Sequence, residues 1–125
     1  MNEDGSSIGW TDVADLNYDN EELRKAMRAE MRFWVEEVGL DGFRCDVAMN
    51  VPAAFWESAV EELKSIKPIF KLAEAKEHNM KLYDKAFDAY YGWQAHEIMN
   101  KIAKGEAKAG ELCKATKAKY DKFPK

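Results

Sequence analysis

The sequence predicts an α/β fold in which short parallel strands alternate with amphipathic helices. Two short, mostly apolar runs, residues 41–48 and 69–75, each carry a carboxylate near the end and are separated by a helical pattern. The 125 residues are 46% hydrophobic and include fifteen aromatics (four Trp, five Tyr, six Phe), enough for the core of one small domain. Strands that alternate with helices imply parallel pairing through right-handed crossovers.

The first helix is predicted from a cap, an apolar stripe and a terminator. Asp19 and Glu22 have the spacing of a capping box with aspartate as the cap. Gly39 is expected to end the helix. An apolar stripe recurs at helical spacing and consists of Leu23, Met27, Met31, Trp34 and Val38. Trp34 on this stripe is expected to lie in the core.

The first strand is expected over residues 41–48, which read DGFRCDVA. Strand side chains alternate between faces, so Arg44 and Asp46 point one way and their neighbours point the other. A carboxylate on a buried strand is costly unless it is paired, and Arg44 is placed to pair with Asp46.

The second helix and second strand follow. Pro52 suits a first helical turn, and Pro68 is expected to end the helix before a strand at 69–75. The apolar face of this helix is predicted to be buried, and it consists of Phe55, Trp56, Ala59, Val60 and Leu63.

The remainder is expected to contain one more strand and three helical segments. A short helical piece is predicted at 80–85, a third strand at 87–91, a helix at 93–104 and a lysine-rich, solvated helix at 111–120. Three strands are few for a parallel sheet, which is normally covered on both faces. The chain is therefore expected to be a piece of a larger parallel α/β fold, such as a (β/α)₈ barrel of about 250 residues.

Asp46 and Glu74 are the candidate reactive groups, because both lie at carboxyl ends of expected strands, where barrels carry their active sites. Adjacent parallel strands lie about 4.8 Å apart, so the two acids could approach within about 5 Å. That separation suits a retaining glycosidase. Paired carboxylates at strand ends also bind magnesium or form structural ion pairs, so the spacing alone leaves these alternatives open.

Residues 41–48 resemble the fourth-strand motif of the α-amylase family, glycoside hydrolase family 13, and residues 72–75 (LAEA) resemble its fifth-strand motif. Residues 13–20 and 87–93 are similar to the segments before and after. The resemblance implies a partial TIM (β/α)₈ barrel, about strands four to six with their helices, acting on α-linked glucans. It also implies that Asp46 is the nucleophile, Arg44 orients it and Glu74 is the general acid/base.

The departures from the family pattern imply a catalytic-centre fragment that is incomplete by itself. The third-strand motif and the seventh-strand motif, with its third catalytic aspartate, have no counterpart here. Many members carry lysine and histidine after the nucleophile motif, where the histidine helps bind calcium and substrate. This chain has Met49 and Asn50 there, so no calcium or other cofactor is predicted. Residues 10–125 are assigned to the barrel fragment and residues 1–9 to a disordered lead.

Three aromatic residues and one further acid follow the second strand. Asp88 is expected early in its strand and is therefore assigned a structural role. Tyr90, Tyr91 and Trp93 suit core packing or stacking on sugar rings, and Tyr91 and Trp93 are the candidates for substrate binding.

Composition argues against several classes of partner. The net charge of −4 disfavours nucleic acid, and no run of eighteen apolar residues could span a membrane. No metal site is predicted, because His78 and His96 lack partners at metal-ligand spacing, and Cys45 and Cys113 are expected to be free thiols. The first seven residues do not read as a signal peptide, and no compartment is assigned.

Two functional hypotheses follow from the sequence. The first is an α-glucan-hydrolysing enzyme of which this chain is the catalytic centre. The second is a non-catalytic α/β fragment. Either way, exposed sheet edges and apolar helix faces predict that the fragment self-associates.

Overall fold

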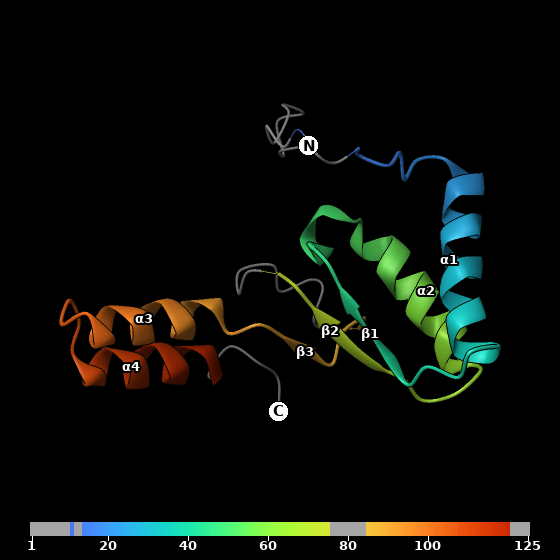
Figure 1. Ribbon diagram of the computed structural model, residues 1–125. Coiled ribbons are helices and arrows are strands. Elements are labelled where there is room, and N and C mark those ends of the chain that lie inside the picture. The colour runs from blue at the N-terminus through green and yellow to red at the C-terminus, as the bar shows by residue number, and fades with distance from the viewer. Residues whose placement is uncertain (1–10, 12–13, 76–84, 121–125) are drawn as a thin grey trace.

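A computed structural model describes residue 11, residues 14–75 and residues 85–120 (Figure 1). Its elements are α1 (Glu21–Glu36), β1 (Gly42–Cys45), the 3₁₀ helix η1 (Ala48–Asn50), α2 (Ala53–Lys64), β2 (Phe70–Ala73), β3 (Ala89–Tyr90), α3 (Trp93–Ala103) and α4 (Ala109–Tyr120). The three strands form one parallel sheet in the order β1-β2-β3. The predicted alternation and parallel pairing are confirmed.

Helices cover one face of the described sheet, not both as expected. Figure 1 shows α1 and α2 together beside β1, whereas α3 and α4 pack on each other and extend away from the strands. Phe70 and the Arg44 side chain lie on the opposite face and are 55% and 41% exposed. We call the side that packs on α2 the covered face and the side with Arg44 the open face.

The core lies between the covered face and α2. Cys45 and Ala73, which are partners in the β1–β2 register, are both buried there. The apolar side of α2 packs on them, as its sequence predicts, through Phe55, Trp56, Ala59 and Val60. The Trp56 indole Nε1–H donates a hydrogen bond of 2.9 Å to the Ala48 carbonyl, so its one polar atom is satisfied.

Helix α1 begins one residue later than the capping-box spacing predicts. The Asn20 side chain is the cap, and its Oδ1 accepts from the backbone N–H groups of Glu22 and Leu23. Asp19 therefore is not the cap. At the other end, α1 stops at Glu36 with Glu37 as its C-cap, earlier than the predicted terminator Gly39. Gly39 follows in a left-handed conformation, φ +84°, and Leu40 N–H bonds to Trp34 O at 3.0 Å.

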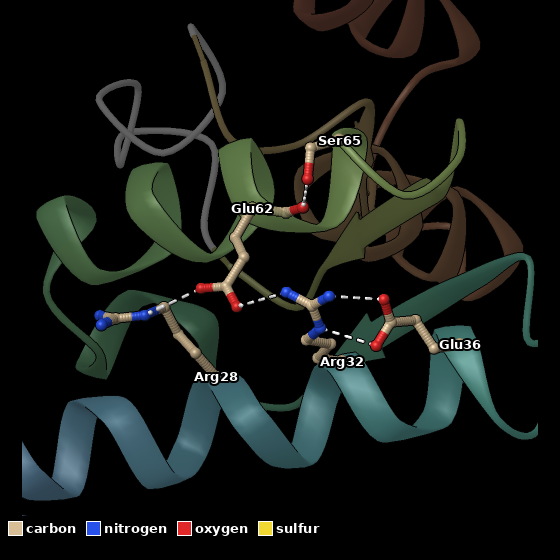
Figure 2. A network of polar contacts seen from close by, with 5 residues as sticks. All are labelled: Arg28, Arg32, Glu36, Glu62 and Ser65. Carbon is tan, nitrogen blue, oxygen red and sulfur yellow. Dashed lines mark hydrogen bonds and ion pairs between the residues drawn. The ribbon is translucent and has the colours of Figure 1, made fainter.

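A polar network joins α1 to α2 on their outer side (Figure 2). Glu62 of α2 accepts from two arginines one turn apart on α1, with Arg28 Nε at 3.2 Å and Arg32 Nη1 at 3.6 Å. Arg32 also holds Glu36 in a two-pronged contact of 2.6 Å for each nitrogen. These contacts link α1 to α2, and the two helices form the layer that lies behind β1.

Several predicted boundaries and one burial assignment are wrong. The strands are shorter than expected, with β1 ending at Cys45 and β3 limited to two residues. Helix α2 ends at Lys64, before Pro68. Trp34 is 45% exposed and does not lie in the core, because nothing described covers that side of α1. The expected lead at 1–9 and all but the last residue of the helical piece at 80–85 lie outside the described residues.

Candidate active site

Parallel pairing brings Asp46 and Glu74 to the same end of the sheet. Each directly follows its strand, and the pairing continues past the strand ends. Glu74 N–H donates to Cys45 O at 2.9 Å, and Ala48 N–H donates to Glu74 O at 2.9 Å. The two carboxylates therefore sit where the sequence predicts, at the carboxyl edge of neighbouring strands.

Arg44 contacts both carboxylates from the open face. Its Nη1 donates to Asp46 Oδ1, and its Nη2 lies 3.0 Å from Glu74 Oε2. The predicted pairing of Arg44 with Asp46 is confirmed, and the contact with Glu74 adds a partner that strand alternation did not specify. The side chains are exposed to different degrees, 75% for Asp46 and 25% for Glu74. The Asp46 carboxylate is therefore largely exposed to solvent, and the Glu74 carboxylate is mostly shielded.

The electrostatics of the cluster favour a charged arginine and an ionised aspartate. Hydrogen bonding from Arg44, with a further hydrogen bond to Glu74, holds the pKa of Asp46 below its usual range. Hydrogen bonds to Tyr91 and Asp46 raise the pKa of Arg44 above its ordinary value. Burial raises the pKa of the neighbouring Cys45 thiol to about 11, so this free cysteine stays protonated near neutral pH.

An aromatic pair borders the cluster. The Tyr91 and Trp93 rings stack with centroids 5.2 Å apart and planes 20° from parallel. The Arg44 guanidinium carbon lies 5.7 Å from the centre of the Tyr91 ring. Trp93 is 42% exposed, and Tyr91 links it to Arg44. The structure thus brings both predicted substrate-binding residues to the site.

Sequence reasoning missed one contact at the site, made by backbone. Val47 N–H donates to Glu74 Oε2 at 3.1 Å. It does so from a left-handed conformation, φ 40° and ψ 44°, which is rare for a β-branched residue. No residue signal indicates this geometry, because valine is disfavoured in it.

The structural role predicted for Asp88 is confirmed. It pairs with Lys71, whose ammonium lies 2.5 Å from Asp88 Oδ2 and also donates to Ile69 O at 2.9 Å. Lys71 is 2% exposed, so Asp88 is the counter-ion of a buried lysine on the covered face. Partial burial acts to raise the pKa of Asp88, but the Lys71 ammonium and N–H outweigh it, and the pKa lies below its ordinary value.

The described part of the chain contains no cluster of three or more His, Cys, Asp or Glu residues that could hold a metal ion. Met49 packs against the core and Asn50 is exposed, so these two positions do not reproduce the histidine found there in many α-amylase-like proteins. His96 bonds to Asn100 at 3.0 Å, as a surface histidine does. Among the described helices, none is long and apolar enough to cross a membrane.

Comparison with known families decides which larger fold this sheet belongs to. The sequence model of the α-amylase catalytic domain matches residues 7–124. The chain belongs to the α-amylase family. This α-amylase-family chain is 31% identical over 107 residues to α-amylase 3 of Dictyoglomus thermophilum, which covers 78% of the chain and 21% of that protein. Over 63 residues it is 42% identical to the maltogenic α-amylase of Bacillus acidopullulyticus, covering 50% of the chain and 11% of that protein.

Solved structures show the same architecture. A noncanonic maltogenic α-amylase from Thermotoga neapolitana superposes with a TM-score of 0.82 at 35% identity, over 91% of this chain and 26% of that one. An α-amylase from Lactobacillus plantarum gives a TM-score of 0.82 at 25% identity, over 96% and 32%. The parallel sheet and its helices are therefore a partial α-amylase barrel. This α-amylase-family chain spans about a third or less of the length of these relatives.

Proposed function

We propose that this chain carries the catalytic centre of a retaining α-glycoside hydrolase that acts on α-linked glucans. The observation that carries the proposal is the single guanidinium of Arg44 in contact with both Asp46 and Glu74 at the carboxyl edge of a parallel sheet. Retaining enzymes need two carboxyl groups about 5 Å apart, one ionised and one able to give up a proton. Contact with one guanidinium brings the two acids close to each other.

The roles follow from the surroundings of each acid. Asp46 is exposed, and its pKa is lowered by hydrogen bonding from Arg44, so its carboxylate is suited to attack the anomeric carbon. Glu74 is more shielded and gives its proton to the leaving glycosidic oxygen as that bond breaks. A water molecule then transfers a proton to Glu74 while its oxygen attacks the anomeric carbon. The bond between that carbon and Asp46 breaks, and the sugar is released with retained configuration.

The aromatic pair is suited to hold the substrate. Sugar rings stack on exposed aromatic faces, and the partly exposed Trp93 ring stacks on Tyr91, which lies against Arg44. Proteins similar to this chain include an α-amylase, a maltogenic α-amylase and a cyclomaltodextrin glucanotransferase, whose names point to α-glucans. We assign Tyr91 and Trp93 to substrate binding on this basis.

We further propose that the chain alone turns over little or no substrate and self-associates. It spans 26% and 32% of the two solved α-amylases, so most of a barrel wall is supplied from outside these residues. Large apolar side chains are exposed at the end of α1, at the start of β1 and on the open face: Phe33, Trp34, Val38, Leu40 and Phe70. Another copy could cover them. A monodisperse monomer in light scattering would contradict the self-association.

The catalytic proposal is tested by hydrolysis of a chromogenic maltooligosaccharide. Two proteins are compared: this chain, and a chimera in which residues 7–124 replace the matching segment of the Thermotoga neapolitana enzyme. The chimera is expected to be active and the chain alone inactive. A folded chimera that does not turn over would overturn the assignment of Asp46 and Glu74 as a working pair.

A further inference from the structure

Val47 has a strained backbone at the centre of the candidate active site. Its φ of 40° and ψ of 44° lie in the left-handed region, where a β-branched side chain clashes with its own backbone. Such strain persists only where the surroundings over-determine it. Here the flanking hydrogen bonds do so: Asn50 N–H bonds to Val47 O, and the next residue, Ala48, is held by both Glu74 and Trp56, each at 2.9 Å.

The strain redirects one hydrogen bond of the sheet. Asp41 O accepts from Phe70 N–H at 2.8 Å, and Cys45 O accepts from Glu74 N–H at 2.9 Å, as in a regular parallel ladder. In that ladder Val47 N–H would be the next donor to Glu74 O. Ala48 N–H takes this place instead, so one extra residue is inserted, as in a β-bulge.

The N–H that leaves the ladder points at the side chain of the same glutamate. Val47 N–H lies 3.1 Å from Glu74 Oε2, and Arg44 Nη2 lies 3.0 Å from the same oxygen. A proton on Oε2 would face two donors, whereas Oε1 receives neither of these contacts. Two donors on one oxygen therefore fix both the rotation of the carboxyl group and the oxygen that stays a pure acceptor.

We propose that Val47 is a positioning residue whose left-handed backbone, together with Arg44, locks Glu74 Oε2 as an acceptor so that the transferable proton is carried on Oε1. The inference rests on the proposed role of Glu74 as the acid/base. It goes further, because it names the oxygen that reacts and the left-handed backbone conformation that selects it.

The contact itself is tested by NMR on this chain, without any activity. The test uses an Asp46→Asn background, which leaves Arg44 and Glu74 as the charged groups at Val47. The chemical shifts of the Val47 amide proton and of the Glu74 carboxyl carbon are measured as a function of pH. The two resonances are expected to move together, and Glu74→Gln is expected to abolish the shift of the amide. A Val47 amide resonance that does not shift as Glu74 ionises would overturn the proposal.

The consequence for proton transfer is tested in the chimera by changing one atom. Incorporation of the α-hydroxy acid analogue of valine at position 47 replaces N–H by an ester oxygen and keeps the side chain. The measured quantity is kcat/KM for a maltooligosaccharide, which needs a proton on its leaving oxygen, and for α-maltosyl fluoride, which needs less assistance. The ester is expected to lower the first about tenfold and the second by less than about twofold.

Two controls separate this effect from general damage. The same ester replacement at Val51, whose N–H bonds to Ala48 O at 3.3 Å, removes a hydrogen bond from the same turn without involving Val47 or Glu74, and is expected to leave the ratio unchanged. Val47→Gly keeps the N–H and suits the left-handed backbone, so it is expected to preserve the ratio as well. An equal loss on both substrates, or no loss on either, would refute the role of Val47.

Failure of this inference and failure of the proposed function give different results. If Glu74→Gln in the chimera retains normal maltooligosaccharide turnover, Glu74 is not the acid/base and the proposed function falls. If Glu74→Gln removes that turnover while the Val47 ester leaves the substrate ratio unchanged, the proposed function stands and only the positioning role falls.

Discussion

The two faces of the three-stranded sheet differ in the way they treat charge. On the covered face, Lys71 is the one charged residue among the described buried side chains, and it is neutralised by Asp88. On the open face, Arg44 lies between two carboxylates, one of which is largely exposed. The same strands therefore provide stability on one side and reactive groups on the other.

This difference shows why neighbouring residues of one strand have unlike roles. Arg44 and Cys45 are adjacent, yet alternation puts the guanidinium in the site and the thiol in the core. Substitutions on the open face should change activity and leave stability intact, and substitutions on the covered face should do the reverse. Four predictions test this division, beginning with the largest expected effect.

The first prediction concerns Asp46. In the chimera, Asp46→Asn is expected to lower kcat/KM for maltooligosaccharides on the order of a thousandfold or more, because the nucleophile is lost. The melting temperature should stay close to that of the parent chimera, since the side chain is 75% exposed. Steady-state kinetics and thermal unfolding measure the two quantities.

Asp41 supplies the matched control for that measurement. It is also an exposed aspartate beside β1, and its partner is Lys67 at 3.0 Å on the other end of the strand. Asp41→Asn is expected to keep full activity. Near-normal turnover of the Asp46 variant, or equal losses in the two variants, would contradict the assignment of the nucleophile.

The second prediction compares two tryptophans. Trp56→Ala is expected to lower the free energy of unfolding by about 4 kcal/mol, because it opens a cavity next to Phe55 and Phe87 and removes the shorter of the two hydrogen bonds to Ala48 O. Trp34→Ala is expected to change it by less than about 0.5 kcal/mol, because the side chain is 45% exposed. Urea unfolding of both variants measures the difference, and comparable losses would mean that Trp34 is buried in solution.

The two tryptophans also show how far sequence reasoning reached. Both lie on apolar helical stripes, and the pattern predicted burial for both. Trp56 is buried because α2 packs on the sheet, while the side of α1 that carries Trp34 meets nothing among the described residues. Periodicity identifies an apolar face, but whether that face is covered depends on tertiary packing that the pattern does not specify.

The site was predicted in its residues but not in its backbone. Parallel alternation and the positions of the acids at strand ends were enough to pair Arg44 with Asp46 and to put Asp46 and Glu74 at one edge of the sheet, but they did not specify the contact between Arg44 and Glu74. The left-handed turn at Val47 could not be predicted, because local preference opposes it and tertiary hydrogen bonds impose it. Cap and strand boundaries shifted for a similar reason, since hydrogen bonds that cross between segments decide where regular structure stops.

The third prediction concerns a backbone feature that both faces share. A methyl group on Gly42 would run into the carbonyl oxygen of Phe70 on β2, so β1 and β2 must separate to admit it. Gly42→Ala is expected to cost about 3 kcal/mol in unfolding free energy and to lower chimera activity, because the register beneath Arg44 shifts. Gly42→Ala should therefore lower stability and activity together, whereas the Asp46 variant is expected to lose mainly activity and the Trp56 variant mainly stability.

Gly110 is the control for the glycine substitution. It lies in α4 with nothing near its added methyl group, so Gly110→Ala is expected to stabilise the helix by about 0.5–1 kcal/mol. Chemical denaturation of both variants gives the comparison. Equal, small effects would show that the β1–β2 contact at Gly42 is looser than the structure indicates.

The fourth prediction isolates the buried charge pair of the covered face. Asp88→Ala leaves Lys71 buried with Ile69 O as its remaining described partner, and is expected to cost about 2 kcal/mol, a value reduced because Asp88 is itself 45% exposed. The double variant Lys71→Met, Asp88→Ala removes the unpaired charge and should recover most of that loss.

The pH dependence of stability gives a second test of the same pair. Because the pKa of Asp88 in the folded chain lies below its ordinary value of 3.8, the stability from its ionised form is present above about pH 4 and is lost as pH falls through the lower folded value. The wild-type chain should therefore lose more stability than the double variant on acidification below pH 4. Parallel stability curves for the two proteins over this range would show that the pair contributes nothing, and the covered face would then hold by apolar packing alone.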